Sequence, residues 1–320
     1  MSQEILVEKN RITALENAIE EYRRFYQSDS AFEKAVLLFK HQLRSFYFVE
    51  APSWRILLRK FGVDKRAAPD FWLTGAVRSG TSTLSNYIFQ HPCVALPLSK
   101  ELSLAMYTLD FFRAQLPLDE ELNKVRKEFG VAMTGHATPS APASNMIYFN
   151  KKMNPAMKVV VILRNPVDRV ISHWRWDLMR TENLLKDPLW KCMPGFEESM
   201  RIEINGLKEG SSGFLLSSGS GGTSYLRHSI YGPSLDLMIK EMGRENIYVV
   251  EAQDFFINTN EVVNGVYDFL GLPECKPILV KETNHSPPLD VSEGLKQELA
   301  DFFKPFNEKL YELVGKDFSW

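Results

Sequence analysis

The sequence LTGAVRSGTSTL, residues 73–84, has the pattern of a phosphate-binding loop between a strand and a helix. Gly75 and Gly80 are five residues apart, as in loops whose backbone N–H groups and following helix N-terminus surround an anion. A side chain at either glycine would keep a phosphate away from that backbone. Thr81 stands where a nucleotide triphosphatase would carry its lysine, and Arg78 lies inside the loop instead. The stretch therefore predicts a phosphate loop whose permanent cation is an arginine.

A second turn from strand to helix supplies a second cation. Residues 157–163, MKVVVIL, are typical of a strand buried on both faces, and Asn165 and Pro166 are a good N-cap and first residue for a following helix. Triphosphatases hold magnesium with an acidic residue at the end of such a strand, whereas this strand ends in Arg164. Ser172 shares the face of the helix start. We therefore expect no metal, and a second phosphate held by Arg164 and Ser172 together.

Strands and helices alternate along most of the chain. Residues 245–255 indicate a strand, residues 260–272 a helix ended by Gly271, and residues 292–315 a terminal helix interrupted by Pro305. This alternation predicts an α/β fold, a P-loop-like parallel sheet covered by helices on both sides. Apolar side chains at helical spacing over 11–48 predict an N-terminal helical extension, with domains at 1–66 and 67–320.

The composition is that of a globular protein with one large core. The 320 residues are 44% hydrophobic, and a formal net charge of -2 argues against broad binding to nucleic acid. Three cysteines are too few for a disulfide framework. The first 24 residues lack the continuous apolar stretch of a signal peptide or membrane anchor. We expect a cytoplasmic protein with no membrane partner, and the oligomeric state is left open.

Residues 206–225 interrupt the alternation with a Gly- and Ser-rich segment that carries Phe214, Leu215 and Leu216 in its middle. Long segments of this kind are either flexible surface loops or functional elements. Two interpretations stay open, a surface loop and a mobile lid over an acceptor site.

The two turns together resemble a known family. RSGTSTL (78–84) and RNPVDRVISHW (164–174) are similar to the two nucleotide motifs of the sulfotransferase superfamily, which uses 3'-phosphoadenosine 5'-phosphosulfate (PAPS) as donor. In that family the first motif binds the 5'-phosphosulfate, and an Arg and a Ser eight residues apart bind the 3'-phosphate. KELSLAMY (100–107) and KETNHSPPLD (281–290), with the ending NEKLYELVGKDFSW, resemble segments of the Golgi-type glycosaminoglycan (heparan sulfate) sulfotransferases. The likeness covers roughly residues 70–320.

The resemblance implies direct in-line transfer of a sulfuryl group to a hydroxyl or amine, with no covalent enzyme intermediate and no metal. The family's base maps to Glu101, and its loop lysine maps to Arg78, which can neutralise charge but hardly donates a proton. His136, in HATP where the family has EKTP, is a second candidate base, or equally an ordinary hydrogen-bonded histidine. The nucleotide-binding residues that the resemblance implies are Arg78, Ser79, Gly80, Thr81, Ser82, Thr83, Arg164, Ser172, Tyr231, Lys281, Thr283, Asn284 and His285.

Several alternatives accompany this interpretation. Tyr231 could be a core tyrosine, and Lys100 a solvated neighbour of Glu101. A P-loop kinase or triphosphatase would need magnesium, and a nucleotide-binding module without catalysis would tolerate loss of Glu101. The acceptor could be a saccharide, as the glycosaminoglycan likeness implies, but no Lys/Arg cluster announces a long basic cleft. We expect a small-molecule acceptor, such as a natural product made by bacteria.

Overall fold

The computed structural model describes residue 51 and residues 53–102, 108–139, 144–180, 195–209, 225–276 and 289–320. The helices predicted over 11–48 lie outside these residues, as do Lys281, Thr283, Asn284 and His285. Of the Gly- and Ser-rich segment, residues 210–224 lie outside as well.

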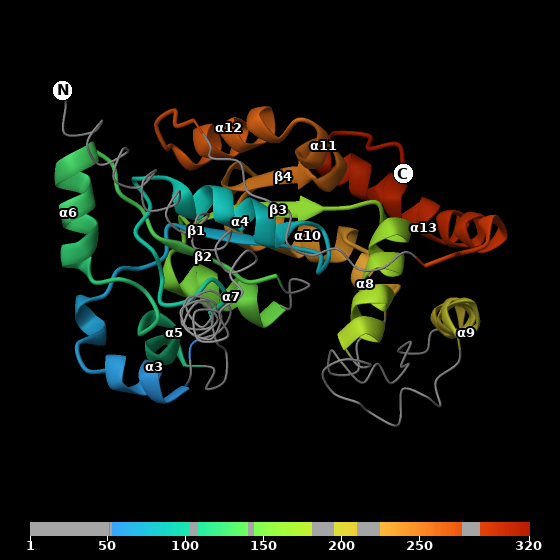
Figure 1. Cartoon of the computed structure of the whole chain (residues 1–320), viewed down its shortest axis with the longest axis horizontal. Coiled ribbons are helices and arrows are strands. Elements are labelled where there is room, and N and C mark those ends of the chain that lie inside the picture. Colours follow the sequence, from blue (N-terminus) through green and yellow to red (C-terminus); the bar gives the residue numbers. More distant parts are fainter. Residues whose placement is uncertain are drawn as a thin grey trace, which may run out of the picture.

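A four-stranded parallel sheet forms the centre of the described chain, with the order β2-β1-β3-β4. Figure 1 shows β3 and β4 ending on the side of the sheet where α8 and α11 lie. Because all the strands are parallel, the turns that follow them meet at one edge. The strands are β1 (Phe71–Gly75), β2 (Gly135–Ala137), β3 (Lys158–Leu163) and β4 (Ile247–Glu251).

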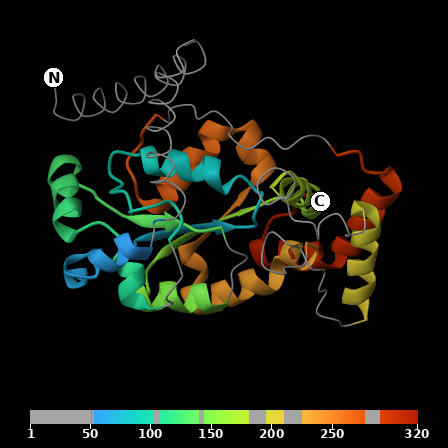
Figure 2. The same ribbon diagram turned by 60° about the horizontal axis from the view of Figure 1, so that its bottom comes forward.

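Helices cover both faces of the sheet, as Figure 2 shows. Phe71 and Leu73 of β1 point into one apolar layer, and Trp72 between them points into the other, as the two-residue period of a strand requires. The α/β prediction is confirmed. The first layer contains α4 (Thr81–Gln90), α11 (Ala252–Ile257) and α12 (Thr259–Leu270), and the second contains α7 (Ser144–Met153), α10 (Gly232–Met242) and α13 (Glu293–Val314).

A third apolar cluster joins two further helices to α13. Val170 and Trp174 pack there with Phe196, Leu299 and Phe303. These contacts fix the helix that follows β3, and with it the second predicted phosphate contact. The two helices are α8 (Pro166–Arg180) and α9 (Phe196–Lys208), and α3 (Ser53–Arg59), α5 (Leu109–Arg113) and α6 (Asp119–Phe129) lie toward the β2 side of the sheet.

Local signals in the sequence set most helix ends but not all of them. Asn165 caps α8, since its Oδ1 accepts a hydrogen bond of 2.9 Å from the N–H of Val167, and Gly271 ends α12 with a left-handed φ of 80°. The predicted interruption at Pro305 is wrong, because α13 continues from Glu293 to Val314. Pro305 is exposed, and the buried side chains Phe303 and Leu310 on either side of it hold both halves against the domain.

Among the described helices, none combines the length and the apolar character that a bilayer crossing requires.

Candidate functional site

The loop after β1 is built so tightly that two of its positions accept only glycine. A Cβ on Gly75, whose φ is 141°, would lie 2.1 Å from the main-chain oxygen of Ile162 in β3. A Cβ on Gly80, whose φ is 96°, would lie 2.8 Å from the ring of Phe256 in α11. Gly75 is therefore required by its contact with the backbone of β3, and the positive φ of Gly80 disfavours any side chain there.

Arg78 connects the two predicted phosphate contacts. Its φ of 73° is unusual for a residue with a side chain and turns the loop back toward α8. The Nε of Arg78 donates a hydrogen bond of 3.3 Å to the hydroxyl of Ser172, and its carbonyl accepts one of 3.1 Å from Nη1 of Arg164. Arg78 thus contacts Ser172, 94 positions away in the sequence, and Arg164, 86 positions away, at the carboxyl edge of the sheet.

The site concentrates positive charge. Burial, together with the charges of Arg164 and Arg175, lowers the pKa of Arg78 to about 10, and Asp177 opposes the shift. Burial also lowers the pKa of Arg175, again with a contribution from Arg164. Guanidinium groups carry a permanent positive charge in proteins, so a bound anion would offset the mutual repulsion of these three. Arg175 was missed in the sequence, although it follows Ser172 by three residues on α8 and shares its helical face.

Arg169 is a second residue that the sequence did not reveal. It is fully buried, and its guanidinium donates to the hydroxyl of Ser229 at 2.6 Å and to the carbonyls of Val77 and Tyr225. Burial lowers its pKa, yet three oxygen acceptors satisfy it. Because Val77 directly precedes Arg78, the hydrogen bond from Arg169 helps to fix the loop from the interior of the protein. A single sequence offers no signal that separates such a buried arginine from a solvated one.

Tyr231 contacts Arg164 and is nearly buried. Its phenol donates a hydrogen bond of 2.9 Å to the carbonyl of Arg164, and burial raises its pKa, so the group stays protonated. Its ring is 6.2 Å from that of Trp320, whose Nε1 donates to Glu251 at the end of β4. The chain terminus is therefore packed beside the second phosphate contact.

Glu101 is linked to the phosphate loop through Lys100. The ammonium of Lys100 lies 3.0 Å from Oε1 of Glu101 and donates a hydrogen bond of 2.8 Å to the hydroxyl of Ser82. The side chain of Lys100 is 8% exposed, whereas that of Glu101 is 28% exposed and accessible. The interpretation of Lys100 as a merely solvated neighbour is therefore wrong, because it is buried between the loop and the carboxylate.

The main chain around Glu101 is pinned to the end of β2. The carbonyl of Lys100 accepts a hydrogen bond of 2.9 Å from Ala137, and the N–H of Leu102 donates one of 3.2 Å to the hydroxyl of Thr138. The carbonyl of Glu101 itself accepts one of 2.9 Å from Ser99. The short strand β2 and the residue after it thus help to fix the position of Glu101 at the edge of the sheet.

His136 lies inside the protein. Its Nδ1 is 3.0 Å from the hydroxyl of Thr138, its Nε2 is 3.0 Å from Oδ1 of Asn150, and its ring packs on Trp72 and Phe112. Burial lowers the pKa of the imidazole to about 4, only partly opposed by the bond to Asn150. This is the arrangement of a hydrogen-bonded interior histidine, the second of the two interpretations that the sequence left open.

The hydroxyl groups of the loop differ in their surroundings. Ser79 is fully buried, and its Oγ has no hydrogen-bond partner among the described residues. Thr81 is nearly buried, and Ser82 and Thr83 are partly exposed at the start of α4. In the described part of the chain, no group of three or more His, Cys, Asp or Glu residues could hold a metal ion.

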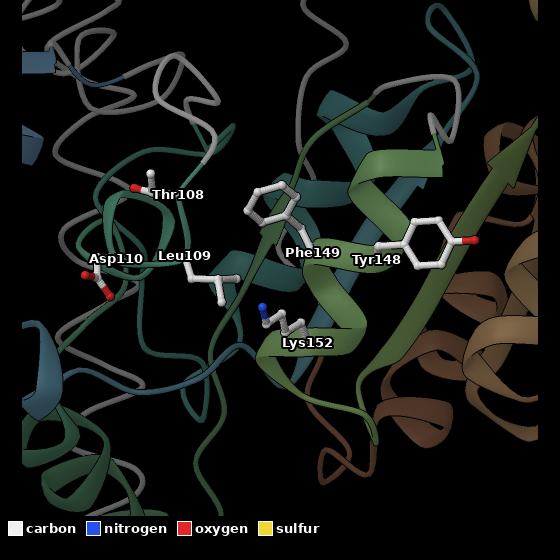
Figure 3. A pocket seen from close by; sticks show the side chains of 6 residues that line it. All are labelled: Thr108, Leu109, Asp110, Tyr148, Phe149 and Lys152. Carbon is white, nitrogen blue, oxygen red and sulfur yellow. The ribbon is translucent and has the colours of Figure 1, made fainter.

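A separate cavity of about 470 Å³ lies between α5 and α7. Figure 3 shows Leu109, Phe149 and Lys152 facing the space between the two helices. None of the predicted site residues lines this cavity.

Comparison with known proteins places these features in a family. A sequence model described as the sulfotransferase domain matches residues 68–286. The membrane-associated sulfotransferase kil1 of Dictyostelium discoideum is 24% identical, over 79% of this chain and 66% of that protein. The heparan sulfate glucosamine 3-O-sulfotransferase 6 of Mus musculus is also 24% identical, over 81% of this chain and 75% of that protein.

A solved structure has the same fold. The crystal structure of a sulfotransferase from Alicyclobacillus acidocaldarius superposes with a TM-score of 0.53 at 22% identity, and the match covers 79% of this chain and 98% of that one. The family match spans both turns, the segment of Glu101 and the strands between them. The chain therefore belongs to the sulfotransferase domain family.

Proposed function

We propose that the protein transfers a sulfuryl group from PAPS to a hydroxyl or amine of a small-molecule acceptor. The observation that carries this proposal is the meeting of Arg78, Arg164 and Ser172 at one edge of the sheet, with Glu101 joined to the same loop through Lys100. Two cationic turns suit a nucleotide with two separate phosphate groups, and the carboxylate lies on the β2 side, away from the second turn.

Residues 78–83 would bind the 5'-phosphosulfate. Arg78 supplies charge, and the start of α4 supplies backbone N–H groups. Arg164, Ser172 and Arg175 would bind the 3'-phosphate, and Tyr231 would hold Arg164 in place through its main chain. Lys281, Thr283, Asn284 and His285 stay proposed nucleotide contacts on resemblance alone.

Glu101 would act as the base. As the acceptor oxygen or nitrogen forms its bond to sulfur, its proton passes to the carboxylate of Glu101. The bond between sulfur and the 5'-phosphate oxygen breaks in the same displacement, and 3'-phosphoadenosine 5'-phosphate (PAP) leaves with the electron pair. Arg78 and Lys100 would stabilise the charge that accumulates on the transferring group and the leaving phosphate. The leaving group departs as an anion, so this step needs no proton from Arg78.

A saccharide acceptor is the second candidate. It is favoured by the similarity to a protein described as a heparan sulfate glucosamine sulfotransferase. The partly exposed Glu101 could serve either acceptor, since both reactions begin with removal of a proton from a hydroxyl or amine.

The test is transfer of radiolabelled sulfate from PAPS to a panel of hydroxyl and amine acceptors that includes heparan sulfate oligosaccharides. We expect labelled product without added magnesium, and Glu101→Gln should bind PAP with unchanged affinity but transfer at least about 100-fold more slowly. Phosphate transfer from ATP that depends on magnesium would instead support a kinase. Unchanged turnover by Glu101→Gln would remove Glu101 from its role.

A further inference from the structure

A continuous chain of hydrogen bonds runs from the segment of Glu101 into the interior. The N–H of Leu102 donates to the hydroxyl of Thr138, that hydroxyl contacts Nδ1 of His136, and Nε2 of His136 contacts Oδ1 of Asn150. All of its members except Leu102 are side chains of β2, of the residue just after it, or of α7. Of these groups, none lies at the accessible surface.

With Oδ1 of Asn150 facing the ring, as the structure has it, the donors and acceptors along these hydrogen bonds take one arrangement. Since the carbonyl oxygen of Asn150 cannot donate, Nε2 of His136 carries the hydrogen, and Nδ1 is the acceptor. The hydroxyl of Thr138 therefore donates to Nδ1 and accepts from Leu102 through its oxygen. A protonated imidazole would present two donors and leave the hydroxyl hydrogen of Thr138 without this acceptor, so the arrangement is that of a neutral ring.

We infer that His136 is a positioning residue, which acts through the hydroxyl of Thr138 to fix the main chain beside Glu101. This inference rests on the proposed function, in which Glu101 is the base. It assigns His136 a different part from a second base, because both of its nitrogens are engaged and its ring lies between Trp72 and Phe112.

The position of Glu101 depends in part on the hydrogen bond between Leu102 and Thr138. Its neighbours bond to β2 and to the residue after it, Lys100 to the main chain of Ala137 and Leu102 to the side chain of Thr138. The first bond is made by backbone atoms and survives substitution of the side chains at 136 and 138. The second can be removed, which would let the chain after Glu101 move while the loop and Lys100 stay in place.

The test uses substitutions that keep volume and change hydrogen bonds. Thr138→Val removes the hydroxyl, Thr138→Ser restores it, and His136→Phe keeps an aromatic ring without nitrogen. The reaction is the breakdown of labelled PAPS to PAP and sulfate in a single turnover, with water as acceptor, so that no acceptor need be known. Amide hydrogen exchange of peptides covering residues 99–102 reports the position of the segment, and thermal unfolding reports whether each variant is folded.

We expect Thr138→Val and His136→Phe each to slow the turnover about 10- to 100-fold, because small misplacements of a reacting group have effects of this size. The dissociation constant for PAP should stay unchanged, exchange over 99–102 should accelerate, and Thr138→Ser should resemble the wild type. The double variant should be no slower than Thr138→Val alone, because His136 acts through Thr138. Phe149→Leu changes a ring of α7 that contacts Phe112 but takes no part in these hydrogen bonds, and it should leave both readouts unchanged.

A Thr138→Val variant with wild-type turnover and wild-type exchange would overturn the inference and leave the proposed function intact. If the rate reductions of Thr138→Val and His136→Phe multiply in the double variant, the inference is also overturned, since His136 would then act independently of Thr138. A wild-type protein that binds no PAP would refute the proposed function instead, and the exchange experiment would still decide whether Thr138 and His136 hold the segment.

Discussion

Arg164 donates a hydrogen bond of 3.1 Å to the main-chain carbonyl of Arg78. The bond joins the turn after β3 to the turn after β1, and these two strands are neighbours in the sheet. Each proposed phosphate contact therefore helps to hold the other, and a change at one should be felt at both.

Arg164→Gln should weaken PAP binding about 10- to 100-fold, because it removes a charged contact to phosphate and loosens the carbonyl of Arg78. Isothermal titration calorimetry measures the change. Arg201→Gln is the matched control, since Arg201 is a half-exposed arginine on α9 that pairs with Glu197 and Glu298. Equal affinities for Arg164→Gln and the wild type would remove Arg164 from the site.

Lys100→Met should lower the rate of transfer about 10-fold or more while the affinity for PAP changes little. The substitution keeps most of the buried side chain but releases both Ser82 and Glu101, so the carboxylate loses its orientation. Lys124→Met, at an exposed position on α6, should leave the rate unchanged. A loss of PAP affinity in Lys100→Met with an intact rate at saturation would show instead that Lys100 mainly binds the donor.

Tyr231→Phe should reduce the free energy of unfolding by about 1 kcal/mol, because the partly buried carbonyl of Arg164 loses its donor. It should also weaken PAP binding several-fold through the displaced Arg164. Urea unfolding and calorimetry measure the two effects, and Tyr148→Phe, at an exposed tyrosine of α7, is the control. A variant as stable as the wild type would mean that the phenol contributes nothing to the second turn.

Stability should fall as the pH decreases from 7 toward 4.5. The pKa of His136 is about 4 in the folded protein against 6.5 ordinarily, so the unfolded chain binds more protons between these values. Burial lowers the pKa of His173 and His228 in the same direction. The contacts described for His136 are to Thr138, Asn150, Trp72 and Phe112, which carry no charge in this range.

His136→Phe should therefore flatten this dependence. Urea unfolding at pH 7 and at pH 5 should give a difference smaller than that of the wild type by about 1–2 kcal/mol, the share of one histidine. The difference between the two pH values is the readout, so a uniform loss of stability in the variant does not affect it. An unchanged difference would mean that His136 is not held neutral by burial.

The sequence predicted the central fold well because the strands β1, β3 and β4 are apolar segments followed by clear helix signals. Asn165 and Gly271 marked helix ends through their own side chain and backbone chemistry. The strand β2 was missed because its three residues, Gly135–Ala137, carry no periodic pattern. Pro305 was misinterpreted because packing of α13 along its whole length outweighs the loss of one helical hydrogen bond.

The site was predictable where a residue type itself carries the chemistry. Arg78, Arg164 and Ser172 followed from motif spacing, and the structure brings them together. Arg169 could not be foreseen, because its role depends on carbonyl groups contributed by distant segments. The part played by His136 likewise required β2 and α7 to be placed, since its partners Thr138 and Asn150 belong to different elements.

The most direct test of the account is a crystal structure of the protein with PAP in the presence of EDTA. The account predicts one PAP molecule with its 5'-phosphate on the loop at Arg78 and its 3'-phosphate against Arg164 and Ser172. A nucleotide bound elsewhere, or one that occupies this edge of the sheet only when magnesium is supplied, would contradict it.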